Sequence, residues 1–300
     1  MTTAYVFPGQ GSQFVGMGSE LSRLRPVALG MFKRADEVLG MSLSTLCFEG
    51  PEAELGDTFN TQPAIFAHSL AALATVELSG EIEPPAFVAG HSMGEFSALC
   101  AAGAVGFEDG LRLVRERGRL MKLAGERQPG SMAAVIGLDA EQLRDACAQA
   151  SQTCQPGVVV ANDNCPGQVV ISGGKQAVAA AGALAKARGA KRVMPLAVSI
   201  AAHSPLMGSI TDEFARAVAA TPLSAARTPV VANTTARPIT HPDDIRAELC
   251  AQLTSPVRWT ESAQWMQSQG VTAYVEVGPK DVLANLIKRI APAAETRAIG

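Results

Sequence analysis

Short apolar runs alternate with longer amphipathic segments along most of this chain. Runs such as 4–7, 86–89 and 272–277 are typical of strands buried in a parallel sheet. Each is followed by a segment in which apolar residues recur every three or four positions, the spacing of a helix that covers a sheet. This alternation predicts an α/β fold for residues 1–127 and 198–300.

The order of elements changes in the middle of the chain. The patterns there predict strand, helix, strand, strand, helix and strand, at 132–136, 140–150, 157–161, 168–172, 176–188 and 192–196. This order is that of the ferredoxin-like unit, and glycine- and proline-rich connections bound it. We therefore predict a small ferredoxin-like subdomain of residues 128–197, inserted into a larger α/β subdomain.

A Gly-x-Ser-x-Gly motif, with the serine at Ser92, lies between an expected strand and an expected helix. The bare pattern is common and occurs by chance, but strand, sharp turn and helix are the context of a nucleophile elbow. Gly90 and Gly94 would let the strand and the helix pass close together. The helix would direct its first N–H groups and its positive dipole end at a developing oxyanion. Ser92 is therefore the candidate nucleophile.

A serine nucleophile needs a general base, and the chain offers four histidines. His203 is the best placed, because it lies after the serine at a junction between a strand-like run and a helix. We expect His91 to point away from the serine, His68 to pack within a helix, and His241 to lie in an exposed turn. No carboxylate can be assigned to orient His203. A backbone carbonyl or an amide such as Gln252 could hold the ring instead.

Three further positions have two interpretations each. The loop around Gln10 is either an ordinary strand-to-helix turn or a source of a second oxyanion N–H, because such loops bind ligands in open α/β sheets. Arg117 lies off the arginine-rich face of its helix, so it needs an anionic partner from the protein or from a substrate. Asn162, in the expected hairpin loop 162–167, either forms the turn or faces a cleft.

Composition excludes several classes of function. The chain has 25 basic and 28 acidic side chains, a net charge of −3, so it lacks the basic footprint of a nucleic-acid-binding protein. No apolar run has the length of a membrane span, and the N-terminal residues lack a secretory pattern. We expect a cytoplasmic chain, with its six cysteines as free thiols. No histidine or cysteine spacing indicates a metal site.

Seven segments of the chain, in order, resemble one known family, the malonyl-CoA:acyl carrier protein transacylases of fatty acid synthesis. The discrete and modular acyltransferases of polyketide synthases share the same motifs. The similarity extends over nearly the whole chain. The segments are 7–13 (FPGQGSQ), 61–64 (TQPA), 90–95 (GHSMGE), 117–118 (RG), 132–135 (MAAV), 166–173 (PGQVVISG) and 276–279 (EVGP).

The resemblance implies an α/β-hydrolase-like large subdomain and a ping-pong transfer of a malonyl group. Ser92, activated by His203, would attack the thioester of malonyl-CoA and release coenzyme A. The phosphopantetheine thiol of acyl carrier protein would then attack the malonyl-serine. Gln252 would orient His203 through its backbone carbonyl, giving a serine–histidine pair in place of a triad. We expect a monomer, because this architecture can close its core in one chain, and no cofactor besides the two substrates.

The resemblance also implies roles for residues around the nucleophile. Gln10 and Met93 would supply the N–H groups of the oxyanion hole. Arg117 would bind the free malonyl carboxylate with two parallel hydrogen bonds. Gln62 and Asn162 would line the cleft.

Two positions depart from the family pattern. Many malonyl-selective members carry phenylalanine just before the histidine, whereas this chain has Ala202, which leaves room for a branched acyl group such as methylmalonyl. Lys280 stands where many members have glycine, and we expect a tolerated turn variant. A polyketide-synthase acyltransferase and an acyl-thioester hydrolase on the same scaffold are the alternative functions. A non-catalytic subunit that binds carrier protein is disfavoured, because it would need neither the serine, the histidine nor the arginine.

One helix face offers a candidate docking surface for an acidic carrier protein. Its basic residues are Arg112, Arg115, Arg119 and Lys122. The alternative is a plain solvated helix face without a partner.

Overall fold

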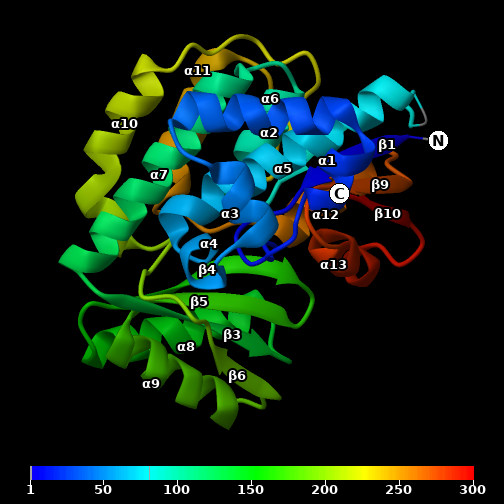
Figure 1. Cartoon of the computed structure of the whole chain (residues 1–300). Helices are drawn as coiled ribbons and strands as arrows, with labels where there is room; N and C mark the ends of the chain where they lie inside the picture. The colour runs from blue at the N-terminus through cyan, green and yellow to red at the C-terminus, as the bar shows by residue number, and fades with distance from the viewer. Residues whose placement is uncertain (1, 81) are drawn as a thin grey trace.

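A computed structural model describes residues 2–80 and 82–300 of the chain. It contains two sheets, each with its own helices (Figure 1). The larger sheet lies among the N-terminal and C-terminal elements, and the smaller one, in green, lies below it. The predicted combination of a large α/β subdomain with a small ferredoxin-like one is confirmed.

The large sheet has six strands in the order β10-β9-β1-β2-β7-β8. All neighbours are parallel except β7 and β8, which pair antiparallel. The strands are β1 (Thr3–Phe7), β2 (Phe87–Gly90), β7 (Val230–Val231), β8 (Pro238–Ile239), β9 (Ala273–Val277) and β10 (Glu295–Ile299). The sequence patterns did not predict β8 and β10. β8 has only 2 residues, and β10 consists largely of exposed residues, several of them polar.

Helices cover both faces of the large sheet. They are α1 (Ser19–Leu24), α2 (Pro26–Leu39), α3 (Leu43–Glu49), α4 (Glu52–Leu55), α5 (Thr58–Ser79), α6 (Gly94–Ala101), α7 (Phe107–Arg127), the 3-10 helix η1 (Pro205–Ile210), α10 (Thr211–Ala220), α11 (Pro242–Gln252), α12 (Trp259–Ser268) and α13 (Val282–Ile290). The helical stretch after the Gln10 loop is divided into two helices, α1 and α2. The break occurs at Pro26, which has no N–H to continue α1 and begins α2 instead.

Alternation along β1 assigns its side chains to two different cores. Tyr5 and Phe7 belong to the core that contains α2, α5, α6 and α7. Ala4 and Val6 belong to the core on the opposite face, with α12 and α13. Successive side chains of a strand point to opposite faces, so this sheet is buried on both sides. Helix α5 is apolar nearly all round and lies in the middle of the larger core.

The small sheet is antiparallel, in the order β4-β5-β3-β6. Its elements are β3 (Gly130–Ile136), α8 (Ala140–Thr153), β4 (Val158–Cys165), β5 (Gln168–Gly174), α9 (Lys175–Ala187) and β6 (Arg192–Pro195). Both helices pack on one face, where they enclose a separate core. The strand order and the two helices are those of the ferredoxin-like unit.

The expectation that Asn162 lies in a hairpin loop was wrong. Asn162 is part of β4, which runs on to Cys165, and the turn itself is only Pro166 and Gly167. Register shifts on either side of Asn162 and Asp163 let the strand continue through this polar stretch. Asn162 also pairs with Val257 of the large subdomain, so β4 joins the two parts of the molecule.

No helix within residues 2–80 and 82–300 is long and apolar enough to cross a membrane.

Candidate active site

The chain folds sharply around Ser92, between β2 and α6. The φ angle of Ser92 is 51°, in the left-handed region that side chains other than glycine rarely adopt. The turn requires glycine on both sides. A Cβ on Gly90 would lie 2.0 Å from the carbonyl of Gly94, and one on Gly94 would lie 2.0 Å from the carbonyl oxygen of Phe7. This backbone is a nucleophile elbow, with the serine side chain on the inside of a cavity.

His203 lies against Ser92. Its Nε2 is 2.8 Å from the Ser92 Oγ, and its Nδ1 is 2.9 Å from the backbone oxygen of Gln252 and 3.1 Å from that of Ser255. A carbonyl oxygen only accepts hydrogen bonds, so Nδ1 carries the ring proton and Nε2 presents its lone pair to the serine hydroxyl. Burial, with a smaller contribution from Arg117, lowers the pKa of His203 to about 3, so the ring is the neutral base.

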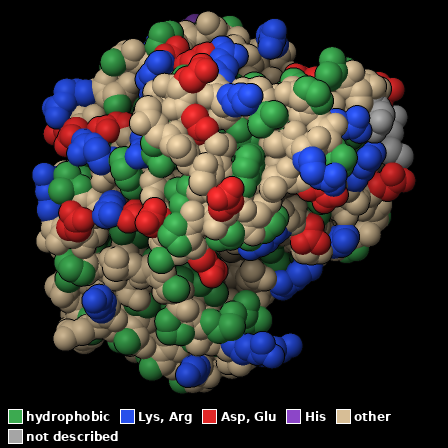
Figure 2. Space-filling view, in the orientation of Figure 1, with side chains coloured by type: hydrophobic (Ala, Val, Ile, Leu, Met, Phe, Trp, Pro, Cys, Tyr) green, Lys and Arg blue, Asp and Glu red, His purple; other side chains and the backbone are tan. Residues whose placement is uncertain are grey.

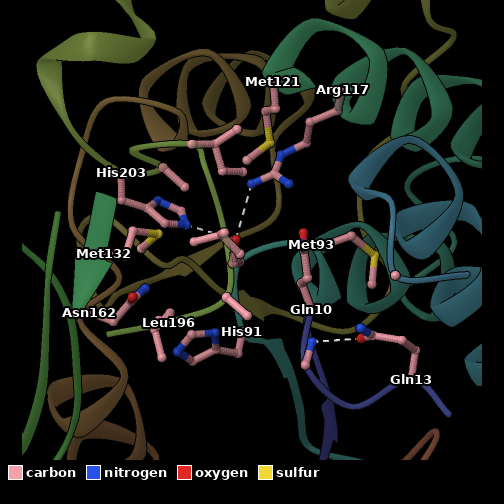
Figure 3. A pocket seen from close by; sticks show the side chains of 17 residues that line it. Gln10, Gln13, His91, Met93, Arg117, Met121, Met132, Asn162, Leu196 and His203 are labelled. Carbon is pink, nitrogen blue, oxygen red and sulfur yellow. Dashed lines mark hydrogen bonds between the residues drawn. The ribbon is translucent and has the colours of Figure 1, made fainter. Parts of the chain in front are cut away.

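Arg117 brings a buried cation to the same hydroxyl. It lies on α7 and is 1% exposed. One terminal nitrogen, Nη2, donates to the Ser92 Oγ at 3.1 Å and to the Gln252 Oε1 at 2.8 Å, while Nη1 donates to the Gln62 Oε1 at 2.9 Å. Figure 3 shows the guanidinium and the His203 ring converging on one oxygen.

The hydrogen-bond acceptors of Arg117 among the described residues, Gln62, Ser92 and Gln252, are all neutral. Of the salt bridges between described residues, none includes Arg117, so the structural ion pair that the sequence left open is absent there. Burial lowers the pKa of this guanidinium to about 10, against the opposing charge of Glu95, and the group remains a cation at neutral pH. Its Nε has no hydrogen-bond partner among residues 2–80 and 82–300. A buried cation with neutral partners is suited to bind an anionic ligand.

Gln252 connects the serine, the histidine and the arginine. Its backbone oxygen holds His203, as the family resemblance implied. Its side chain does more than was expected: Oε1 accepts from Arg117, while Nε2 donates to the backbone oxygen of Ser92 at 3.0 Å and to the carboxyl of Glu95. Because Arg117 only donates and the Ser92 carbonyl only accepts, the orientation of this amide is fixed.

The two residues predicted to supply the N–H groups of an oxyanion hole lie beside the cavity. Met93 follows the nucleophile at the start of α6, and Gln10 lies in the loop after β1; both line the cavity with Ser92. Among the hydrogen bonds of the described residues, neither backbone N–H donates to a protein acceptor. The N–H of Ser92 itself is taken, because it donates to the Asn233 Oδ1 at 2.7 Å.

The cavity has a volume of about 360 Å³ and is lined mainly by apolar side chains. Both subdomains contribute to it: Met132 and Asn162 come from the small sheet and face the histidine (Figure 3). Gln62, which was expected to line the cleft, is absent from the lining. It is fully buried behind Arg117 and also donates to the sulfur of Met121, at 3.2 Å.

None of the three other histidines hydrogen-bonds to the Ser92 hydroxyl, although His91 also lines the cavity. The ring of His91 is 2.8 Å from the Asn164 Oδ1 and packs near Trp259. His68 is buried in α5, where burial lowers its pKa to about 4. His241 is exposed and accepts from the N–H of Asp243 at the start of α11.

Sequence reasoning missed a group of buried polar residues behind the elbow. Glu95 accepts from the backbone N–H of Asn233 at 2.9 Å, and Asn233 contacts the elbow through its side chain. Glu248 accepts from the N–H of Thr234 at 2.9 Å. Burial and the neighbouring Glu248 hold the pKa of Glu95 well above its usual range. One signal was present in the sequence: Asn233 lies just beyond the carboxyl end of β7, two residues after Val231, and α/β proteins place site residues at such strand ends.

Three of the four basic residues on the candidate docking face of α7 pair with carboxylates. Arg112 pairs with Asp109, Arg119 with Glu116 and Glu213, and Lys122 with Asp57. The guanidinium of Arg115 lies 3.6 Å from the centre of the Phe59 ring. Figure 2 likewise shows basic and acidic side chains intermingled on this side of the molecule. The structure therefore favours the plain solvated helix face over the carrier-protein docking surface.

The cysteines and the potential metal ligands of the chain do not form a second reactive site in the described residues. All six cysteines are free thiols, and burial raises the pKa of Cys47, Cys100 and Cys147 to about 12. No cluster of three or more metal-ligating side chains occurs in the part of the chain that the structure describes.

Comparison with known proteins identifies the family. The model of the acyl transferase domain matches residues 4–297. The chain is 44% identical over 296 residues to the malonyl CoA-acyl carrier protein transacylase of Bacillus subtilis, covering 99% of this chain and 92% of that protein. It is 45% identical over 289 residues to the Escherichia coli K12 protein of the same name, covering 96% and 92%.

Solved structures agree over the whole chain. An acyl carrier protein S-malonyltransferase from Vibrio cholerae superposes with a TM-score of 0.96 at 44% identity, covering 100% of this chain and 97% of that one. A malonyl-transacylase in complex with a type II PKS acyl-carrier protein superposes with a TM-score of 0.95 at 42% identity, covering 99% and 96%. The chain therefore belongs to the acyl transferase domain family, among its malonyl-CoA:acyl carrier protein transacylases.

Proposed function

We propose that this enzyme transfers a malonyl group from malonyl-CoA to the phosphopantetheine thiol of acyl carrier protein, for use in fatty acid synthesis. The observation that carries the proposal is the position of Arg117. Its Nη2 lies 3.1 Å from the nucleophile Oγ, and none of the described hydrogen-bond acceptors of the buried guanidinium is a carboxylate. A nucleophile beside such a cation suits an acyl group that ends in a carboxylate. The curated relatives and solved structures support the same activity.

The first half-reaction acylates the serine. The Ser92 Oγ attacks the thioester carbonyl carbon of malonyl-CoA, while His203 Nε2 removes the hydroxyl proton. The carbonyl oxygen becomes an oxyanion, which the backbone N–H groups of Gln10 and Met93 stabilise. When the intermediate collapses, the C–S bond breaks and the imidazolium returns the proton to the coenzyme A sulfur. Malonyl-Ser92 and free coenzyme A result.

The second half-reaction is the same chemistry in reverse with another thiol. Neutral His203 removes the proton from the phosphopantetheine thiol, and the sulfur attacks the carbonyl carbon of malonyl-Ser92. The oxyanion forms in the same hole, the C–O bond to Ser92 breaks, and the imidazolium returns the proton to the serine Oγ. No redox step or cofactor is needed in this cycle.

Arg117 selects the acyl group. The malonyl carboxylate would take up bonds from its guanidinium in a charge-assisted, bidentate pair. A neutral acetyl group leaves the same buried cation without an anion, which disfavours it by several kcal/mol. Gln62 and Gln252 hold the guanidinium for this pairing, since each accepts one of its N–H groups. The arginine is thus fixed before the substrate arrives.

Asn162 and the rest of the cavity have supporting roles in the proposal. The Asn162 amide faces the cavity from β4 and is placed to hydrogen-bond the acyl group or the pantetheine arm. Every residue of the proposed site comes from one chain, so we propose that the monomer is active. Static light scattering at the assay concentration tests that state.

A discrete acyltransferase of a polyketide synthase is the second candidate, and Ala202 favours it. The residue lines the cavity directly beside His203, with only a methyl group there. This leaves space next to the acyl carbon for the extra methyl of methylmalonyl. The two candidates share one mechanism and differ in substrate range.

A transfer assay tests the proposed function. The enzyme is incubated with malonyl-CoA labelled in the malonyl group and with phosphopantetheinylated acyl carrier protein, and the label on carrier protein is counted. Ser92→Ala and His203→Ala should each abolish the transfer, while carrier protein without its phosphopantetheine should receive none. Release of labelled malonate to water as fast as the label reaches carrier protein would instead assign a hydrolase.

A further inference from the structure

A single amide side chain is bonded to the nucleophile elbow at two points. Asn233 lies two residues after the end of β7 and is 1% exposed. Its Oδ1 accepts from the backbone N–H of Ser92 at 2.7 Å, and its Nδ2 donates to the backbone oxygen of Gly90 at 2.7 Å. Asn233 thus bonds two peptide groups that lie on either side of His91, within the strained turn. It does not line the cavity itself.

The elbow needs such a partner. Ser92 has a left-handed φ of 51°, which costs free energy, and the turn contains backbone groups that neither the sheet nor α6 can pair. An unpaired, buried N–H or C=O group costs about 1–3 kcal/mol. The Asn233 amide satisfies one donor and one acceptor of this turn at once. It therefore stabilises the unusual conformation relative to a relaxed turn.

Asn233 is itself held from two sides. Its backbone N–H donates to the Glu95 Oε1 at 2.9 Å, and its backbone oxygen accepts from the N–H of Arg258 at 2.9 Å. The orientation of the amide is also determined, since the Ser92 N–H only donates and the Gly90 carbonyl only accepts. The side chain has one arrangement that satisfies all these partners, so it constrains the elbow rather than adapting to it.

This contact determines which N–H groups face the substrate. With the Ser92 N–H bonded to Asn233, the next peptide group along the chain, that of Met93, is left for the oxyanion hole. The same contact fixes the Ser92 backbone from which the Oγ reaches His203 at 2.8 Å. We propose that Asn233 is a positioning residue for the nucleophile, which holds the Ser92 elbow in its reactive conformation without touching the substrate. This inference rests on the proposed function.

Two substitutions separate the two contacts. Asn233→Asp has the same shape and keeps an acceptor for the Ser92 N–H, but it places a carboxylate oxygen against the Gly90 carbonyl, where both groups only accept. Asn233→Ala removes both contacts. Thr234→Val is the matched control, because Thr234 is the next residue and bonds Glu248 instead of the elbow.

The test measures acylation, binding and stability separately. The rate of malonyl-Ser92 formation is followed by intact-protein mass spectrometry after rapid mixing with malonyl-CoA. Binding of malonyl-CoA is measured by calorimetry in a Ser92→Ala background, with and without Asn233→Asp, and each Tm is recorded. Small displacements of a reacting group cost about 100-fold in rate, so N233D and N233A should acylate about 100-fold more slowly than the parent. Binding should be unchanged, because Gln62 and Gln252 still hold Arg117.

Several results would overturn the proposal. Acylation of N233D within about threefold of the parent would show that the elbow does not depend on this amide. A parallel loss of rate and of binding, or unfolding of both variants, would assign Asn233 a purely structural role. T234V should acylate at the parental rate, and an equal loss there would place the effect in the loop as a whole. Failure of the parent enzyme to form an adduct would instead contradict the proposed function, not this inference.

Discussion

Arg117 is the candidate site residue whose open sequence interpretation the structure narrows most, because the structure shows its hydrogen-bond partners. The helix pattern alone indicated that its side chain lies off the solvated face. It did not decide whether the anionic partner of Arg117 comes from the protein or from a substrate. In the structure the guanidinium is 1% exposed and bonds to Gln62, Ser92 and Gln252, with no carboxylate partner among the described residues. A neutral substrate end would leave this cation unpaired, whereas a carboxylate would complete its bonding.

Substitution of Arg117 should remove the preference for malonyl over acetyl groups. Loss of one partner of a buried charge pair costs about 2–5 kcal/mol, so Arg117→Ala should lower the ratio of malonyl to acetyl acylation by about 100-fold. Parallel acylation rates with malonyl-CoA and acetyl-CoA measure that ratio. Arg119→Ala is the control, because Arg119 lies on the same helix in surface ion pairs. An unchanged ratio in R117A would refute the carboxylate-binding role.

The lowered pKa of His203 predicts an activity that resists mild acid. Burial and Arg117 both favour the neutral ring, so the base form persists well below the ordinary value of 6.5. We expect kcat/KM for malonyl-CoA to show no loss centred near pH 6.5. In R117A the cation is gone, the pKa of His203 rises, and the acidic fall in rate moves to higher pH. A parental profile that falls through pH 6.5, or an R117A profile that moves to lower pH, would contradict this account.

Ala202 should make the acyl cavity permissive toward one extra methyl group. A single methylene distinction is worth about 1–3 kcal/mol, so Ala202→Phe should lower the methylmalonyl-to-malonyl ratio of adducts by about 10-fold or more. The enzyme is given both coenzyme A esters together, and the two adducts are separated by mass. Malonyl acylation of A202F serves as the internal control. Equal ratios in both proteins would show that the side chain at position 202 does not control the acceptance of the methyl branch of methylmalonyl.

At the scale of elements, the strand–turn–helix around Ser92 could be predicted from local sequence. Strand and helix pass so close together at this turn that Gly90 and Gly94 leave no room for a side chain. The turn after β9 shows a second steric case. Lys280 occupies the position where many relatives carry glycine, and its φ is 66°. Its Nζ donates to the backbone oxygens of Gly11 and Gln13, at 3.4 and 3.1 Å. The expected turn variant is therefore strained at its backbone and anchored through its side chain.

Two substitutions of Lys280 separate these effects. Lys280→Ala loses the hydrogen bonds and keeps the strained backbone, whereas Lys280→Gly loses the bonds and relieves the strain. Because a left-handed residue with a Cβ costs about 1–2 kcal/mol, K280G should be more stable than K280A by about 1 kcal/mol. Urea unfolding of both variants gives the difference. A K280G protein less stable than K280A would show that the left-handed φ carries no cost here.

Element boundaries were harder to predict where tertiary contacts override local pattern. The polar stretch around Asn162 has the composition of a loop, yet it continues β4, because Val257 of the distant large subdomain pairs with it. Nothing local to residues 158–167 encodes that partner. The same is true of β8 and β10, which form against strands already in place.

At the scale of the whole molecule, the sequence predicted the fold class and the pair of subdomains but not how they share the cavity. Periodicity and element order are local properties, so they identify a ferredoxin-like unit between two parts of an α/β unit. The convergence of Ser92, His203 and Arg117 depends on contacts between residues up to 111 positions apart. Family resemblance supplied that arrangement. Of the buried group of Glu95, Asn233 and Glu248, only Glu95 lies in one of the motifs, and no role was predicted for it.

The central claim is a malonyl-serine that is transferred to a thiol, and intact-protein mass spectrometry tests it most directly. The enzyme is mixed briefly with malonyl-CoA, and phosphopantetheinylated acyl carrier protein is then added. The account predicts a malonyl adduct on the parent enzyme, none on Ser92→Ala, and movement of the adduct to carrier protein in the second step. An adduct that persists in Ser92→Ala, or one that decays equally fast with and without carrier protein, would contradict it.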